Sequence, residues 1–270
     1  MSSIEGDRER FSRLERLIGA PGREKLAGAR VVVAGLGAVG SYATEALVRA
    51  GVGALRLVDF DVVRRSNINR QLYALESTLG QPKTEAARRR ILDIHPDCQV
   101  ETCCLFLHAD TMEQVLAGPP DLVIDAIDSF KPKVELLCAV TSRAIPVVSC
   151  MGAALRTDPL AVRVGRLEEV RHCPLARRIR KELRRRRVPV SMTCVHSCES
   201  VMHIPREARG GTGEAGEELH ERGRSRSPLG SLPTITGLFG LLAAHTALHL
   251  LLGGSWVPAR PENICPPSSG

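Results

Sequence analysis

Residues 30–59, RVVVAGLGAVGSYATEALVRAGVGALRLVD, decide the fold. A short valine-rich run leads into three glycines at the spacing GxGxxG, and a helical pattern follows before a second apolar run that ends at Asp59. This order predicts a strand, a tight turn, a helix and another strand. In such a unit, Gly35 allows the turn, Gly37 lets the backbone approach a phosphate, and Gly40 lets the helix pack close to the sheet. The sequence therefore predicts an α/β fold with a Rossmann-like, doubly wound and mainly parallel sheet.

Asp59 lies about 20 residues after the glycines, where the acidic residue that holds a nucleotide ribose is expected. The helix that begins near Gly40 would offer free N–H groups at its amino terminus to a phosphate. These features alone are also typical of nicotinamide and flavin enzymes. The residues that follow Asp59 favour a different chemistry, because they add fixed positive charges and further carboxylates.

Three short segments, DFDVVRRSNINRQ, GQPK and DAIDS, add polar residues to the predicted nucleotide site. These residues are Asp61, Asn67, Arg70, Lys83, Asp128 and Ser129. An enzyme that splits ATP between its α and β phosphates needs cations for the charge that develops on pyrophosphate, and a carboxylate for the metal. We therefore expect Arg70 and Lys83 to bind phosphate and Asp128 to hold Mg²⁺. The alternatives are a surface lysine at position 83 and a helix-capping aspartate at position 128. The sequence leaves open whether Asp61 positions the loop or the metal.

Taken together, these segments resemble the E1-like, ThiF/MoeB-type adenylating enzymes. The resemblance covers residues 10–170 and rests on RFSRLERL, VVVAGLGAVGS, LVDFDVVRRSNINRQ, GQPK and DAIDS. Within that family the chain is similar to the tRNA threonylcarbamoyladenosine dehydratases, through RQLYAL, DAIDSFKPK, DPLA, CVHSCE and ITGLFGLLAAHTAL. The resemblance implies an ATP- and Mg²⁺-dependent cyclisation of threonylcarbamoyladenosine (t6A) in tRNA through an acyl-adenylate. It also implies a homodimer, and it suggests a cysteine desulfurase or sulfur acceptor as a further partner.

In this family an arginine of the amino-terminal helix reaches the ATP site of the partner subunit. Residues 8–18 predict such a helix, whose apolar side carries Phe11, Leu14, Leu17 and Ile18. The spacing found in the dehydratases favours Arg16 as a catalytic residue beside Arg70, Lys83 and Asp128. The RxxR pattern of the sulfur-carrier enzymes favours Arg13 instead. On composition alone these arginines form a solvated charged face.

The composition suits an enzyme with reduced thiols. The chain has 270 residues, nine cysteines and a formal net charge of +7. The positive charge favours a polyanionic partner, although a solvated basic surface explains it nearly as well. The amino terminus is charged and has no apolar leader, so we expect reduced cysteines and a cytoplasmic protein with no DNA partner. A mitochondrial location, or a membrane tether through residues 235–252, is the alternative.

Two parts are predicted along the chain. Residues 8–170 form the nucleotide-binding adenylation domain, and residues 171–260 form a basic substrate region. We expect a flexible loop over residues 205–231, which are rich in Gly, Arg, Glu and Ser. Residues 235–252 are apolar and just long enough to span a membrane. Their small residues favour a buried core or dimer helix over membrane association.

Residues 171–187, RHCPLARRIRKELRRRR, carry the densest positive charge in the chain, and Glu182 alone offsets it. Release of counterions from a polyphosphate backbone would strongly favour RNA binding by such a cluster. No aromatic residue interrupts it, so it predicts backbone contact and not base readout. A solvated helix face is the alternative interpretation.

Cys194 and Cys198 flank His196 in the segment CVHSC. They could form half of a metal site, but no second cysteine pair follows at the spacing of a zinc ribbon. Sulfur-carrier adenylating enzymes usually have two such pairs here, so their absence favours the dehydratases. We expect Cys194 to pack in the core and to have no catalytic role.

Two other functions compete with the tRNA dehydratase. One is adenylation of the carboxyl-terminal glycine of a ubiquitin-like sulfur-carrier protein, which needs the same ATP residues. The other is a non-catalytic, nucleotide-dependent scaffold. The complete set of Arg70, Lys83 and Asp128 argues against the scaffold.

Overall fold

A computed structural model describes residues 3–200 and 229–253 of the chain. One seven-stranded sheet forms its centre, with the strand order β3-β2-β1-β4-β5-β7-β6. The strands are β1 (Arg30–Ala34), β2 (Ala54–Val58), β3 (Gln99–Cys103), β4 (Leu122–Asp125), β5 (Val147–Cys150), β6 (Val162–Arg166) and β7 (Thr193–Ser197). All neighbouring pairs are parallel except β6 with β7. The predicted mainly parallel α/β fold is therefore confirmed.

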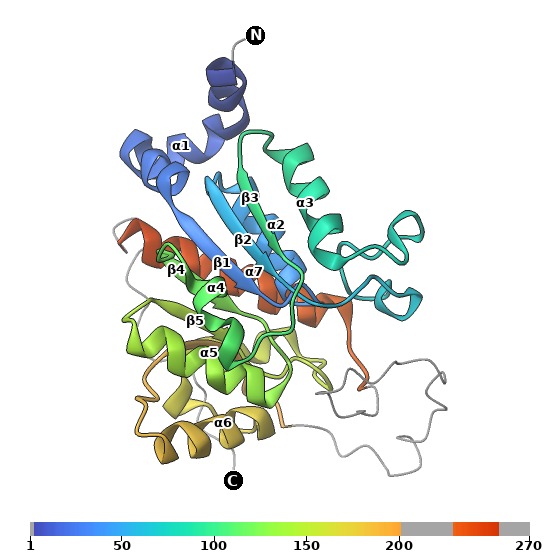
Figure 1. The fold of residues 1–270 in the computed structure, drawn as a ribbon, viewed down its shortest axis with the longest axis vertical. Coiled ribbons are helices and arrows are strands. Elements are labelled where there is room, and N and C mark those ends of the chain that lie inside the picture. The colour runs from blue at the N-terminus through green and yellow to red at the C-terminus, as the bar shows by residue number, and fades with distance from the viewer. Residues whose placement is uncertain (1–2, 201–228, 254–270) are drawn as a thin grey trace.

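Helices cover both faces of the sheet (Figure 1). They are α1 (Ser3–Gly28), α2 (Gly40–Arg49), α3 (Lys83–Ile94), α4 (Met112–Leu116), α5 (Phe130–Ser142), α6 (Pro174–Arg185) and α7 (Pro233–Leu252). Alternate residues of β1 point to opposite faces, as a pleated strand requires. Val31 and Val33 pack in one core with α2, α3 and α7, whereas Val32 packs in a second core with α4 and α5. The central strands are apolar on both sides because both sides are covered.

The order of the strands fixes where a ligand can bind. β1 lies between β2 and β4, so the chain leaves β1 in one direction along the sheet and later returns to its other side. The connections that follow β1 and β4 therefore diverge at the carboxyl ends of these strands, which makes a topological switch point. In open α/β sheets, ligands bind at this position. The glycine turn after β1 and the DAIDS segment after β4 both lie at this edge.

α7 is a core helix. Its residues Phe239, Ala243 and Ala247 are completely buried, and the helix packs against α2 and the sheet. A Cβ added at Gly240 would lie 2.3 Å from the carbonyl oxygen of Val39, so only glycine permits this close contact between α7 and α2. Within the described residues, α7 is the single helix long and apolar enough to cross a membrane, and 56% of its most apolar window is buried. The predicted buried helix over residues 235–252 is confirmed.

Two features differ from the expectations. The sheet does not end near residue 170, because β7 (Thr193–Ser197) inserts between β5 and β6. The amino-terminal helix extends to Gly28 with a non-helical residue at Gly19, and its residue Leu17 is 68% exposed although Phe11 is buried. Leu17 therefore does not belong to the buried side of α1. Nearly all of the loop predicted over 205–231 lies outside the described residues.

Candidate active site

The glycine turn links β1 to α2 and leaves space above its backbone. Gly35 has φ = +91°, and a Cβ there would lie 2.9 Å from the carbonyl oxygen of Ala126. A Cβ at Gly40 would lie 1.8 Å from the carbonyl oxygen of Gly35. Gly37 is different, since a Cβ there would meet only the Gln71 side chain, at 3.9 Å. The packing of the protein itself thus requires glycine at 35 and 40, whereas at 37 the open space suits a ligand that approaches the backbone.

Asp59 ties the end of β2 to this turn. Its carboxylate accepts a hydrogen bond of 2.7 Å from the backbone N–H of Leu36 and one of 2.9 Å from that of Asp61. Burial raises the pKa of Asp59, and the positive charge of Lys83 opposes that shift. Each carboxylate oxygen has a second lone pair. Asp59 therefore shapes the turn and keeps acceptor capacity, while its predicted contact with ribose stays a prediction.

Lys83 and Asp61 form an ion pair beside the turn. The Lys83 Nζ lies 2.9 Å from Asp61 Oδ2, and the two side chains are 7% and 37% exposed. The backbone N–H of Lys83 also donates to the carbonyl oxygen of Asp61. Lys83 is the first residue of α3, so the start of that helix is fixed to the loop after β2. Lys83 is therefore not a loose surface lysine, and Asp61 is its counter-ion.

Arg70, Asn67 and Gln71 belong to the loop that follows. The side-chain Oδ1 of Asn67 accepts a hydrogen bond from the backbone N–H of Arg64, and the backbone carbonyl oxygen of Asn67 accepts from the backbone N–H groups of Arg70 and Gln71. The Arg70 guanidinium donates to Ser66 and Asn69 within its own turn. The structure thus gives Asn67 a role in shaping the loop. Gln71, the next residue of the same motif, is buried, and its side chain lies nearest to Gly37.

Asp128 and Ser129 lie between β4 and α5. Asp128 is exposed, and the Ser129 hydroxyl donates to its Oδ1 at 3.3 Å. Ser129 is the N-cap residue of α5, but its side chain makes no capping hydrogen bond. The Asp128 carboxylate therefore remains accessible at the ligand-binding edge of the sheet.

A second lysine–aspartate pair lies beneath Asp128 and was not predicted. Asp125, the last residue of β4, pairs with Lys133 of α5 at 2.8 Å, and both side chains are 0% exposed. The Ser149 hydroxyl on β5 donates to the same Asp125 oxygen at 2.6 Å. Lys133 also donates to the carbonyl oxygen of Ile127 at 2.9 Å. Lys133 stands eight positions after the end of β4, and nothing in the sequence there indicates burial. It could therefore not be distinguished from a surface lysine by sequence.

Arg16 and Arg13 lie far from this edge within one chain. Both are exposed on α1, which leads directly into the start of β1 (Figure 1). The nucleotide edge is at the other end of β1, and a five-residue strand is about 16 Å long. Neither Arg16 nor Arg13 therefore reaches the glycine turn of its own chain.

The basic helix α6 packs beside α5. Ala176, Ile179 and Leu183 form its buried face, and Glu182 pairs with Arg185 and Arg186. The guanidinium of Arg178 stacks over Phe130 at 4.5 Å from the ring centroid, and Phe130 lies two residues after Asp128. Phe130, Arg178, Lys181, Glu182, Arg184 and Arg185 line a shallow pocket. An aromatic ring therefore does lie among these arginines, although it comes from another segment of the chain.

Cys194 lies in β7 and is completely buried, which confirms the expected core packing. Burial raises the pKa of its thiol to about 12, so it is not a thiolate at neutral pH. His196 is buried on the same strand, its Nδ1 has no hydrogen-bond partner, and burial lowers its pKa. Within residues 3–200 and 229–253, no group of three His, Cys, Asp or Glu side chains could hold a metal by itself.

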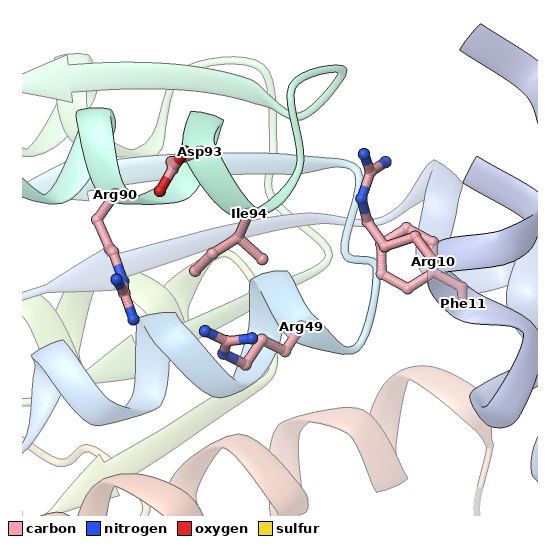
Figure 2. A pocket seen from close by; sticks show the side chains of 6 residues that line it. All are labelled: Arg10, Phe11, Arg49, Arg90, Asp93 and Ile94. Atoms are coloured by element: carbon pink, nitrogen blue, oxygen red, sulfur yellow. The ribbon is translucent and has the colours of Figure 1, made fainter. Parts of the chain in front are cut away.

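A separate polar pocket lies at the opposite end of the sheet. Figure 2 shows its six lining residues, Arg10, Phe11, Arg49, Arg90, Asp93 and Ile94. Arg49 and Arg90 come from the ends of α2 and α3 and both pair with Glu45. These arginines already have a carboxylate partner and are remote from the glycine turn, so this pocket is not part of the nucleotide site.

Comparisons with known proteins show which proteins the chain resembles in sequence and fold. The model of the ThiF family matches residues 11–264. A tRNA threonylcarbamoyladenosine dehydratase of Bacillus subtilis is 37% identical over 89% of this chain and 94% of its own length. The solved E. coli tRNA N6-threonylcarbamoyladenosine dehydratase in complex with ATP superposes with a TM-score of 0.80 at 31% identity, over 91% of this chain and 95% of that chain. A molybdopterin-synthase adenylyltransferase of Salmonella typhimurium is 39% identical, but over only 51% of this chain and 54% of its length.

Proposed function

Because the chain belongs to the ThiF family, we propose that it is an ATP-dependent tRNA dehydratase that cyclises threonylcarbamoyladenosine to its cyclic form. The observation that carries this proposal is the match to a dehydratase over 89% of this chain and 94% of the relative's length. The open space at Gly37 and the buried Lys83 paired with Asp61 support it. The ATP-bound E. coli relative has the same fold. The molybdopterin-synthase relative matches only half of the chain, which disfavours the sulfur-carrier alternative.

ATP would lie over the glycine turn with its ribose near Asp59. Lys83 would bind a phosphate by exchanging its contact with Asp61 for the more strongly charged ligand, and Arg70 would leave its own turn to do the same. Ser129 and Asn67 would line the site. Both cations stabilise negative charge as it develops on the leaving pyrophosphate, and a fixed charge of this kind contributes about 3–4 kcal/mol.

The donor set fits Mg²⁺ that arrives with ATP. Mg²⁺ usually binds one or two carboxylates together with substrate phosphates and water, and it does not need a cage of protein ligands. Asp128 offers one accessible carboxylate at the ligand-binding edge, and no larger cluster exists among the described residues. Asp128 would therefore hold the ion, which supplies charge neutralisation on the phosphates when bound.

The reaction needs two attacks and no enzyme nucleophile. The threonyl carboxylate of t6A attacks the α phosphorus of ATP, the bond to the β-phosphate oxygen breaks, and pyrophosphate leaves. A nitrogen of the carbamoyl linkage then attacks the activated carbonyl carbon, loses its proton and expels AMP. The net loss from the RNA is one water. The buried, protonated Cys194 agrees with this route because no thiolate is required.

The tRNA would approach along α6. Arg177, Lys181 and Arg184 are exposed on this helix, opposite its buried face, and no ion pair is described for them. Phe130 connects this basic surface with Asp128 and offers a ring on which a base could stack. The surface would hold RNA phosphates by charge, with no sequence readout of its own.

A homodimer would complete the site. Arg16 is exposed at the wrong end of its own sheet, so it would act on the ATP of the partner subunit, and Arg13 is the alternative. Leu17 of α1 and Leu241 and Leu250 of α7 are exposed leucines on two helices that pack together. Such apolar surface suits an interface. We place the enzyme in the cytoplasm, where a cysteine desulfurase could be a further partner.

Pyrophosphate release separates the candidate functions. The full chain is assayed with Mg²⁺ and ATP in the presence of t6A-containing tRNA, the same tRNA without t6A, or a ubiquitin-like carrier protein. A dehydratase releases pyrophosphate only with the t6A-containing tRNA, whose mass then falls by one water. Release with the carrier alone would support the sulfur-carrier alternative, and no release in any arm would support a scaffold.

A further inference from the structure

Lys133 and Asp125 form the most deeply buried ion pair in the described part of the chain, and its cost needs an explanation. Both side chains are 0% exposed. Removing two charges from water costs several kcal/mol per ion, and a pair of apolar residues of similar volume is often as stable. A buried pair is therefore weak evidence of stabilisation by itself. What distinguishes this pair is the set of groups that the ammonium contacts.

The Lys133 ammonium lies within hydrogen-bond distance of three oxygen atoms of one short segment. The Nζ lies 2.8 Å from Asp125 Oδ2, 2.9 Å from the carbonyl oxygen of Ile127 and 3.4 Å from that of Asp125. An ammonium has three donors, so none remains for any other group. Lys133 thus binds the backbone on both sides of Ala126 and directly before Asp128.

The same segment is held from its other sides as well. The N–H of Ala126 donates to the carbonyl oxygen of Ala34, and the N–H of Ile127 donates to the carboxylate of Asp125. The carbonyl oxygen of Ala126 lies against Gly35, where a Cβ would approach it to 2.9 Å. Ser149 fixes the Asp125 carboxylate from β5. Residues 125–127 are therefore fixed between the glycine turn and α5.

We propose that Lys133 is a positioning residue, which sets the place of the Asp128 carboxylate relative to the glycine turn by holding the carbonyl oxygen of Ile127. The proposal rests on the proposed function in one respect, the binding of Mg²⁺·ATP by Asp128. Lys133 itself does not touch the nucleotide, since its charge is sealed and balanced by Asp125. Supporting residues behind a metal ligand typically change metal affinity by about 10- to 100-fold.

The test measures equilibrium binding by calorimetry on the full chain. ATP affinity is determined with Mg²⁺ and with EDTA, and AMP affinity is determined alongside. In Lys133→Met the gain in ATP affinity on adding Mg²⁺ falls about tenfold, while AMP affinity stays within about twofold because the glycine turn is untouched. Lys131→Met, at an exposed position of the same helix, is the matched control and keeps the full gain.

The double variant Asp125→Asn/Lys133→Met separates positioning from charge balance. It removes both buried charges, so the folded state no longer contains an unpaired ion, but the carbonyl oxygen of Ile127 still lacks its donor. If Lys133 positions the loop, the gain in ATP affinity on adding Mg²⁺ stays as low in the double variant as in Lys133→Met. A double variant with the full Mg²⁺ gain would overturn the proposal, because Lys133 would then only neutralise Asp125.

Amide hydrogen exchange of the wild-type protein gives a second measurement that requires no variant. The backbone N–H groups of Ala126 and Ile127 should exchange as slowly as those of the adjoining strand β4, and in any folded Lys133 variant they should exchange faster. Rapid exchange of this segment in the wild type contradicts the proposal. Asp128→Asn tests the assumption on which the proposal rests, namely that Asp128 binds Mg²⁺·ATP. If that variant keeps the Mg²⁺ gain, the metal assignment of the proposed function is wrong, whereas the exchange data still decide whether Lys133 holds the loop.

Discussion

Two lysine–aspartate pairs lie on either side of the glycine turn, and they differ mainly in burial. The Lys83–Asp61 pair has a lysine that is 7% exposed and an aspartate that is 37% exposed, so one side of it meets solvent. The Lys133–Asp125 pair is 0% exposed on both sides. Their separations, 2.9 Å and 2.8 Å, are nearly equal. A pair open to solvent can exchange a partner for a ligand, whereas a sealed pair can only hold what surrounds it.

The largest expected effect comes from substituting Lys83, the lysine of the pair that is open to solvent. Lys83→Met should lower the rate of pyrophosphate release with t6A-containing tRNA by about 10²- to 10³-fold, because a fixed charge on the leaving group is lost. Stability should change little, since Asp61 can be solvated in the variant. Steady-state kinetics and thermal unfolding measure the two effects. Lys25→Met, on the exposed surface of α1, is the control. A variant that loses stability and keeps its rate would reverse the roles assigned to the two pairs.

Substitution of the fully buried Lys133 should mainly lower stability. Lys133→Met leaves Asp125 buried and unpaired, which costs about 3–5 kcal/mol of unfolding free energy. Urea denaturation followed by circular dichroism measures this loss, and Asp125→Asn/Lys133→Met should recover most of it. If the single variant is as stable as the wild type, water reaches Asp125 and the pair is not sealed.

The cations of α6 offer a third environment, exposed and largely without counter-ions. Lys181→Ala/Arg184→Ala should raise the KM for tRNA by about tenfold and reduce the salt dependence of tRNA binding by about one to two counterions. The rate at saturating tRNA should be unchanged. Arg88→Ala/Arg89→Ala, at exposed positions of α3, is the matched control. An equal effect of both double variants would mean that only net charge matters.

His196 is expected to have a smaller effect. It is a buried histidine whose charged form is disfavoured by burial more than the nearby Glu169 favours it. Burial lowers its pKa below the ordinary value of about 6.5. Between the lowered native pKa and about 6.5 the unfolded chain binds more protons, so the unfolding free energy rises with pH in that window. His196→Gln should flatten this rise, because the titrating group is removed. Denaturation curves between pH 5 and 7 measure it, and an unchanged pH slope would contradict the assignment.

The open pair could be foreseen from sequence, and the sealed pair could not. Lys83 and Asp61 stand in the short contiguous motifs GQPK and DFDVVRRSNINRQ, and the neighbouring residues of each motif indicate that these positions belong to a nucleotide site. Lys133 acquires its role from Asp125 on β4 and Ser149 on β5, whose register only the assembled sheet determines. Phe130 reaches Arg178 across 48 positions in the same way. Leu17 fits the apolar pattern of α1 but is exposed, because the path of α1 over α7 decides which side is covered.

A structure with Mg²⁺ and a non-hydrolysable ATP analogue tests the difference between the two pairs most directly. The expected result is that the Lys83 Nζ moves from Asp61 to within hydrogen-bond distance of a phosphate oxygen, while Lys133 keeps its contacts with Asp125 and the carbonyl oxygen of Ile127. Nucleotide bound over the glycine turn with Lys83 still on Asp61, or with Lys133 released from its loop, would contradict it.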